Sequence, residues 1–172
     1  MILTAALVYF DQTKTYTPKE LLDNTCFVKF DIKDQTQNYK RTIEKSTVEW
    51  WKGQEKSIQQ ISVFPSSNDV TAEKGIKVLR EYIRDNTVEK NEICWIRGTL
   101  DQVCMDSLCK DLQVPFIFKY YQYRDVRTAL DLIKETTKRG YCKIPNFDFK
   151  QVVKHDPRWD VVLDAFMLMY GE

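Results

Sequence analysis

The sequence predicts a single α/β domain over residues 1–172, from three observations. Segments with the composition of β-strands alternate with segments whose apolar residues recur at helical spacing. The length of 172 residues is that of one domain, and no repeat or linker divides it. With 43% hydrophobic and 13% aromatic residues, the chain can bury a substantial core.

Four segments have the composition of strands. Residues 3–10 form a continuous apolar run, which is typical of a strand covered on both faces. The other three are residues 26–32, 92–96 and 116–121, which are rich in β-branched and aromatic side chains. The first run is too short to span a bilayer and has neither a basic lead-in nor a small-residue cleavage site, so we expect a cytoplasmic protein without a membrane anchor.

Capping signals and apolar spacing predict six helices. The segments from Thr17 to Glu20 and from Ser46 to Glu49 both match the capping-box pattern at a helix start. The last helix begins at Pro157, with Asp156 as its N-cap. The remaining helices are expected over about residues 70–86, 100–112 and 125–138, and loops over residues 65–69 and 139–154.

Charge and cysteine content narrow the function classes. The 26 basic and 25 acidic residues give a net charge of +1, which argues against a protein that binds nucleic acid through charge alone. An enzyme that uses metal ions is less affected by this argument, because its pocket must itself be acidic to hold them. The five cysteines form no CxxC pair and His155 is the only histidine, so we expect reduced thiols and no zinc site.

Two carboxylates and the histidine are the candidates for chemistry. Asp101 and Asp160 each lie in the first turn of a predicted helix, and His155 precedes Asp160 by five residues. A single carboxylate at such a position usually only stabilises the helix start. Together, the two could hold divalent metal while the histidine takes a proton from an attacking water. Asp106 and Asp164, on the same helices, are expected to be solvated.

Four segments carry a family resemblance: Ser46 to Trp51, Trp95 to Asp101, Tyr123 to Thr128, and His155 to Asp160. Through them the chain resembles the DEDDh group of 3′–5′ exonucleases, in particular the phage exonuclease A (DexA-type) proteins and related exoribonucleases. The resemblance covers nearly the whole chain. A histidine and an aspartate separated by four residues are common by chance, but four such segments in the family's order are specific.

The resemblance implies a ribonuclease-H-like mixed sheet flanked by helices. It also implies hydrolysis of the terminal phosphodiester of single-stranded DNA or RNA with two Mg²⁺ or Mn²⁺ ions. Carried over by motif, Asp101 and Asp160 would be metal ligands and His155 the general base. If the chain is phage-encoded, the location would be the host cytoplasm. DNA and RNA both stay open as substrates, because no element that reads the 2′-hydroxyl is recognisable.

Two arginines and two tryptophans have weaker signals. Arg124 and Arg127 could bind phosphate, since the guanidinium fork suits it, but a role in organising the start of the following helix is the preferred interpretation. Trp50 and Trp51 could stack on a nucleobase. Because adjacent helical side chains point in different directions, we expect at least one of the two in the core.

The family's first motif, Asp-x-Glu on the first central strand, is missing. Asp11 follows an apolar strand, but Thr13 stands two residues later and cannot replace a carboxylate. Residues 2–11 resemble the family's second strand instead, so we expect an N-terminally incomplete domain that lacks the first central strand. The strand of residues 2–10 should then pair with residues 26–32 on one side and leave its other edge bare.

Three explanations of the missing strand stay open: an upstream start codon, a separate polypeptide that supplies the strand, or a decaying gene product. The leading hypothesis is a metal-dependent 3′–5′ exonuclease, and the chain as given should have little activity. The rival is a non-catalytic nucleic-acid-binding or interaction protein that kept the fold. An unrelated α/β interaction domain would require all four matching segments to be accidental.

Overall fold

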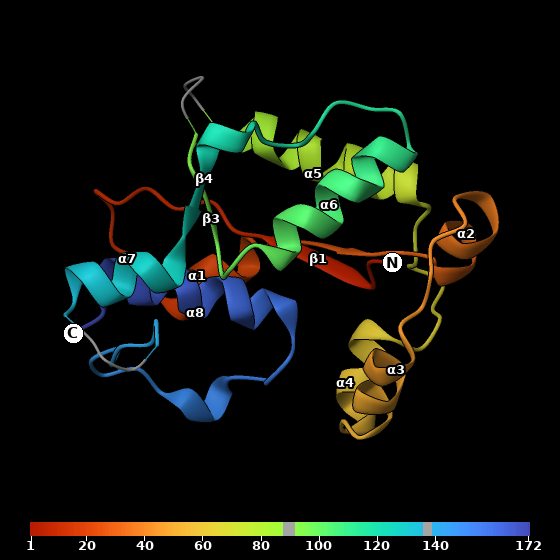
Figure 1. The fold of residues 1–172 in the computed structure, drawn as a ribbon. Helices are drawn as coiled ribbons and strands as arrows, with labels where there is room; N and C mark the ends of the chain where they lie inside the picture. The colour runs from red at the N-terminus through yellow and green to blue at the C-terminus, as the bar shows by residue number, and fades with distance from the viewer. Residues whose placement is uncertain (88–91, 136–138) are drawn as a thin grey trace.

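The computed structural model describes residues 1–87, 92–135 and 139–172 (Figure 1). Within these residues, strands and helices are mixed along the chain, which confirms the α/β class. The elements are β1 (Thr4–Leu7), α1 (Pro18–Asp23), β2 (Cys26–Lys29), α2 (Ile32–Asn38), α3 (Lys45–Lys52), α4 (Lys56–Ser62), α5 (Ala72–Asn86), β3 (Cys94–Ile96), α6 (Leu100–Asp111), β4 (Tyr123–Asp125), α7 (Val126–Ile133) and α8 (Pro157–Tyr170), with 3₁₀ turns at Tyr120–Gln122 and Phe149–Gln151.

The strands of the described residues form two separate two-stranded sheets. β1 pairs with β2 in antiparallel fashion, with Thr4 opposite Lys29, and β3 pairs with β4 in parallel fashion, with Cys94 opposite Tyr123. The predicted pairing of residues 2–10 with residues 26–32 is therefore confirmed, and within the described part of the chain no strand pairs with the other edge of β1.

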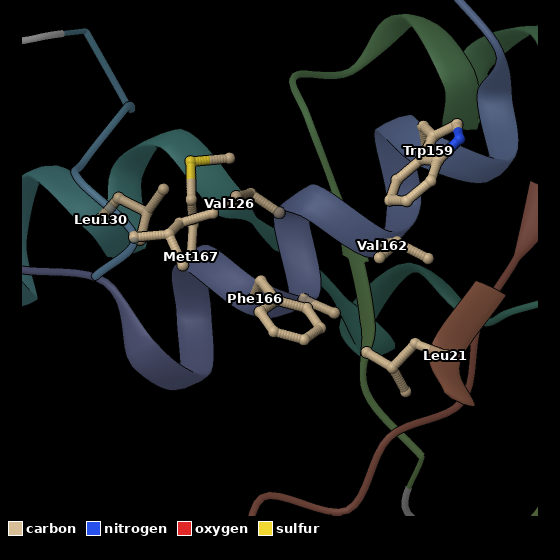
Figure 2. Close-up of a cluster of buried hydrophobic side chains, with 9 residues drawn as sticks. Leu21, Val126, Leu130, Trp159, Val162, Phe166 and Met167 are labelled. Carbon is tan, nitrogen blue, oxygen red and sulfur yellow. The ribbon is translucent and has the colours of Figure 1, made fainter. Parts of the chain in front are cut away.

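Apolar side chains form two cores, one on α8 and one on α5. Figure 2 shows the α8 core, in which residues of α8 pack against α1 and α7. Its buried members are Leu21, Val126, Leu130, Ile144, Trp159, Val162, Ala165, Phe166 and Met167. The α5 core joins β2, α5 and α6 through Val28, Phe30, Ala72, Ile76, Leu79, Leu108 and Cys109. Among the described residues, no helix is both long and apolar enough to cross a membrane.

Two predicted helix starts are confirmed in detail. The Thr17 hydroxyl accepts from the Glu20 amide at 3.2 Å, and the Glu20 carboxylate accepts from the Thr17 amide at 2.6 Å, which completes the capping box. Asp156 caps α8 by accepting from the Arg158 amide at 3.0 Å, with Pro157 in the first turn. Both ends follow from local chemistry, because each caps its own neighbouring amides.

The prediction of a capping box at residues 46–49 is wrong. α3 begins at Lys45, so Ser46 is already inside the helix, and the N-cap Glu44 makes no side-chain capping bond. The Ser46 hydroxyl instead donates to the Glu44 carboxylate at 3.2 Å. A pattern of this kind fixes a helix start only to within a residue or two.

The strand predicted at residues 116–121 is also wrong. The Lys119 amide donates to the Gln122 side chain at 2.7 Å, and the Gln122 amide donates to the Lys119 carbonyl at 2.9 Å, so this segment closes a turn. The strand is β4, directly after it. Tyr120 is 85% exposed, so the aromatic run that suggested a strand lies on the surface. Aromatic content by itself does not distinguish a buried strand from an exposed turn.

Several strands and helices are shorter than predicted. β1 covers only four residues of the predicted range 3–10. β2 stops at Lys29, because Asp31 caps α2 by accepting from the Lys33 amide at 2.7 Å. α7 ends at Ile133, and residues 136–138 of its predicted range lie outside the described residues. The short helices α2 and α4 were not predicted.

Candidate functional site

A cavity of about 1190 Å³ lies between the two sheets, and all three candidate residues are among those that line it. Its walls come from β1, β3, α5, the N-terminal half of α6 and much of α8. Asp101 lines it from α6, Asp160 from α8, and His155 from the loop that leads into α8. The spatial convergence of these residues in a close group stays a prediction. The fold shows that two segments, the start of α6 and the stretch from His155 into α8, contribute them to one cavity.

The surroundings of Asp160 disfavour its negative charge. Desolvation raises the pKa of Asp160 to about 6, and the neighbouring Asp164 and Asp156 act in the same direction. His155 and Arg97 oppose this rise. Near neutral pH, a bound cation or proton would therefore stabilise the Asp160 side chain more than it would stabilise an ordinary, solvated aspartate.

The pKa values of Asp101 and Asp164 are also raised, but the two carboxylates differ in their partners. The pKa of Asp101 is raised by desolvation and, second, by the charge of Asp164. Desolvation also raises the pKa of Asp164, although the bond to Arg97 works against this. The negative charge of Asp164 raises the pKa of both Asp101 and Asp160, so Asp164 interacts electrostatically with both candidate metal ligands.

Asp164 is part of the site, and the prediction that it is solvated was wrong. Arg97 Nε donates to Asp164 Oδ1 at 2.9 Å, and Nη2 donates to the same carboxylate. The third guanidinium nitrogen, Nη1, donates to the Gly140 carbonyl at 2.8 Å, and the group lies 4.4 Å from the ring centre of Tyr141. The missed signal was spacing, since Asp164 follows Asp160 by four residues and so shares its helix face.

The Arg97–Asp164 pair also connects the two segments that carry the candidate ligands. Arg97 stands four residues before Asp101, at the end of β3, and Asp164 stands one turn after Asp160 on α8. The two side chains are only 17% and 20% exposed. A bidentate, largely buried ion pair of this kind fixes geometry more strongly than a surface pair does.

His155 has an aromatic neighbour from a distant part of the chain. The Trp50 ring centre lies 5.0 Å from the imidazole, with the two rings nearly perpendicular, and Trp51 packs edge-on against Trp50 at 4.9 Å. α3 has no buried residue, so the expectation that one tryptophan belongs to the core was wrong. Trp50 is 47% exposed beside the histidine.

The two arginines with weaker signals differ in position. Arg124 is exposed, and its Nη1 donates to the carbonyls of Tyr121 and Tyr123 at 2.7 and 2.8 Å, which supports the preferred structural interpretation. Arg127 lines the cavity beside Gly98 and contributes positive charge near Asp164. Of the two, Arg127 has the position from which a phosphate could be reached.

The residues present do not fit a complete two-metal site. Among the described residues, no three histidine, cysteine, aspartate or glutamate side chains converge to hold a metal ion. Mg²⁺ requires near-octahedral oxygen coordination, and Asp164 is already held by Arg97. Asp101 and Asp160 by themselves fall short of what two ions need.

Comparison with known proteins identifies the family. A family model described as the 3′–5′ exoribonuclease Rv2179c-like domain matches residues 5–160, which include Asp101, His155 and Asp160. The chain belongs to this family. Membership in the Rv2179c-like family confirms the expected resemblance to exonucleases and makes the chain a nuclease-type enzyme, a class whose members generally use divalent metals.

A relative with a related description supports this assignment. The chain is 27% identical over 189 aligned positions to an exodeoxyribonuclease of Enterobacteria phage T4, and the match covers 99% of this chain and 81% of the phage protein. No solved structure matches the chain significantly. The description of the family names an exoribonuclease, whereas the phage relative is named an exodeoxyribonuclease. The two comparisons therefore differ in the nucleic acid that they name.

Proposed function

We propose that this Rv2179c-like protein removes nucleotides from the 3′ end of single-stranded nucleic acid by hydrolysing the terminal phosphodiester, on a ribonuclease-H-like fold. The observation that carries the proposal is the cavity lined by Asp101, Asp160 and His155, which come from two separate segments within the family match. The pKa of each carboxyl group is raised, and the charge of His155 acts on Asp160. Perturbed titratable groups in a cavity are typical of catalytic sites.

The chain's own residues divide the proposed work. His155 would accept the proton of the attacking water, and the ring of Trp50 beside it would stack on a terminal base. Arg127 would contact a phosphate at the cavity wall. Mg²⁺ or Mn²⁺ ions at Asp101 and Asp160 belong to the proposal as the expected cofactors, but no step is assigned to them, because the ligand set is incomplete.

A second candidate function is a non-catalytic nucleic-acid-binding or interaction protein. The specific observation in its favour is that the described residues hold no metal-binding group of three side chains. This candidate would use the same cavity and the adjacent Trp50 ring, and it differs in predicting binding without hydrolysis.

The test is degradation of single-stranded DNA and RNA carrying a label at either the 3′ or the 5′ end, with Mg²⁺, Mn²⁺ or a chelator. We expect metal-dependent loss of the 3′ label first, at a low rate. Asp101→Asn and Asp160→Asn should abolish it, whereas Asp106→Asn, on the same helix as Asp101 but away from the cavity, should not. Binding of the oligonucleotide without release of either label would favour the non-catalytic candidate.

A further inference from the structure

A second surface lies outside the cavity, on the segment that joins α6 to β4. Residues 112–124 carry five aromatic side chains and two basic ones, with no acidic residue among them. In Figure 1 this segment runs from the end of α6 to β4 along the upper margin of the molecule. Phe118 and Tyr123 line the cavity, whereas the other three aromatic side chains are exposed. The segment therefore has an inner face, which belongs to the site described above, and an outer face that this site does not use.

The outer face presents aromatic rings to solvent. Phe116 is 45% exposed, Tyr121 55% and Tyr120 85%. The rings of the two tyrosines are neighbours, with their centres 5.5 Å apart and their planes nearly perpendicular. A single exposed apolar residue is ordinary on a protein surface, but adjacent exposed rings are typical of a binding surface.

Hydrogen bonds hold the two tyrosines on a closed turn. The Lys119 amide donates to the Gln122 side chain at 2.7 Å, and the Gln122 side-chain amide donates to the Glu92 carbonyl at 3.1 Å. From the following strand, Arg124 Nη1 donates to the Tyr121 carbonyl at 2.7 Å. Because these bonds fix the turn in advance, a ligand that stacks on its rings has little conformational entropy to remove.

Basic side chains accompany the exposed rings. Lys119 Nζ lies 5.7 Å from the centre of the Tyr121 ring, and Lys110 Nζ, at the end of α6, lies 5.7 Å from the centre of the Phe116 ring. Among the described residues, neither lysine forms an ion pair with an acidic side chain. Both positive charges are therefore available to a ligand of this face.

Together these side chains form a surface that we call the aromatic–basic patch: Lys110, Phe116, Lys119, Tyr120, Tyr121 and Arg124. Asp111, the acidic residue next to it in the sequence, is paired with Arg41. Such a surface suits single-stranded nucleic acid, because bases stack on the rings while the cations contact phosphates. A protein partner fits less well. Lysine is depleted in the cores of protein–protein interfaces, and here both lysines lie over the rings that such a core would bury.

We propose that the aromatic–basic patch binds single-stranded nucleic acid on the 5′ side of the end that enters the cavity. β4 begins at Tyr123, beside the patch, and ends at Asp125, where the paired strand β3 leads into the loop before Asp101. A strand of three residues spans roughly 7–10 Å, so one bound strand can contact both places. Its continuation into the cavity rests on the proposed function, whereas binding at the patch does not.

Fluorescence anisotropy with a labelled dodecathymidylate or dodecauridylate, in the presence of a chelator, measures the binding. Tyr120→Ala and Tyr121→Ala should each weaken it at least about fivefold, the lower limit for the loss of one stacked base. Tyr120→Trp, which keeps a ring, should bind as tightly as the wild type. Phe149→Ala is the matched control, because Phe149 is 56% exposed but lies outside the patch, and it should leave the affinity unchanged. The two homopolymers show whether the patch favours DNA or RNA.

The dependence of binding on salt tests the cations. Lys119→Gln should reduce the slope of log affinity against log salt by about 0.7, the value for one phosphate contact on a single strand. Lys19→Gln, on α1 and 82% exposed, should not change it.

Three results would overturn the proposal: no binding of either dodecanucleotide by the wild type, unchanged affinity in both tyrosine-to-alanine variants, or an equal loss in Phe149→Ala. Self-association of the wild type that Tyr120→Ala abolishes without weakening nucleic-acid binding would also overturn it, because the patch would then be an interface between copies of the chain. Since nothing is hydrolysed in chelator, absence of nuclease activity would contradict the proposed function and leave the binding result standing.

Discussion

At the scale of single residues, the charge of Asp160 should set a pH dependence of stability. Its pKa is raised to about 6, chiefly by desolvation. A carboxyl group with a folded pKa above its unfolded value of about 3.9 stabilises the fold below that lower value and loses this contribution as the pH rises through about 6. Asp160→Asn should therefore stabilise the protein at pH 7 to 8 and leave it unchanged near pH 3.5.

Chemical denaturation of both proteins across this pH range gives the measurement. Asp23→Asn, at an exposed position on α1, is the control and should show no such divergence. Parallel stability curves for Asp160→Asn and the wild type over the whole range would contradict the prediction.

The second prediction for a single residue concerns the guanidinium group of Arg97 and its contribution to stability. Arg97→Lys keeps the charge, but one ammonium cannot reproduce the two bonds to Asp164 together with the bond to the Gly140 carbonyl. We expect a loss of about 1.5–3 kcal/mol in the free energy of unfolding, which is the range for charged hydrogen bonds. Arg84→Lys, whose partner Asp85 is the adjacent exposed residue, should cost much less. Equal losses for the two variants would show that the Arg97 geometry does not matter.

At the scale of elements, α5 approaches β2 closely because a helix residue lacks a side chain. A Cβ atom at Gly75 would lie 2.3 Å from Phe30 Cε1, and the Phe30 ring is buried in the α5 core. Alanine in place of glycine normally stabilises a helix by about 1 kcal/mol. The close approach of α5 to the sheet reverses this preference, since the ring cannot move away without disturbing the core.

Gly75→Ala should accordingly lower the free energy of unfolding by about 1–3 kcal/mol, the typical cost of overpacking. Gly53→Ala is the matched control, because a Cβ atom there comes no closer than 3.4 Å to the Trp50 carbonyl oxygen. Thermal or denaturant unfolding of the two variants compares them directly. A stabilised Gly75→Ala would mean that helix preference outweighs the contact with Phe30.

At the scale of the whole molecule, the cavity separates two cores that should respond independently. Leu79 belongs to the α5 core and Leu130 to the α8 core, and each is about 1% exposed. Leu79→Ala and Leu130→Ala should each cost about 2–5 kcal/mol, the usual cost of removing a buried leucine side chain. Substitution in one core should lower hydrogen-exchange protection mainly in the helices of that core. A uniform fall in protection across α5 and α8 in both variants would show a single cooperative core.

Features that depend on neighbouring residues were determined by the sequence. The capping box at Thr17 and the start of α8 at Asp156 and Pro157 are correct because each involves bonds within one turn. The resemblance to the exonuclease family could also be predicted from the sequence, since the family's motifs are short segments in a fixed order. The failures were also local in origin: residues 116–121 have strand composition, but the turn closed by Gln122 prevails there.

Only the tertiary structure decided which residues meet. The sequence predicted a solvated Asp164, but in the structure Arg97, which is 67 positions away, binds its carboxylate. The contact of Trp50 with His155 likewise joins segments with no shared pattern. Sequence periodicity describes one element's own faces, whereas such contacts depend on how elements pack. The sequence predicted an outer edge of β1 without a strand partner, and none is present among the described residues, whereas the size of the cavity beside this edge depends on packing alone.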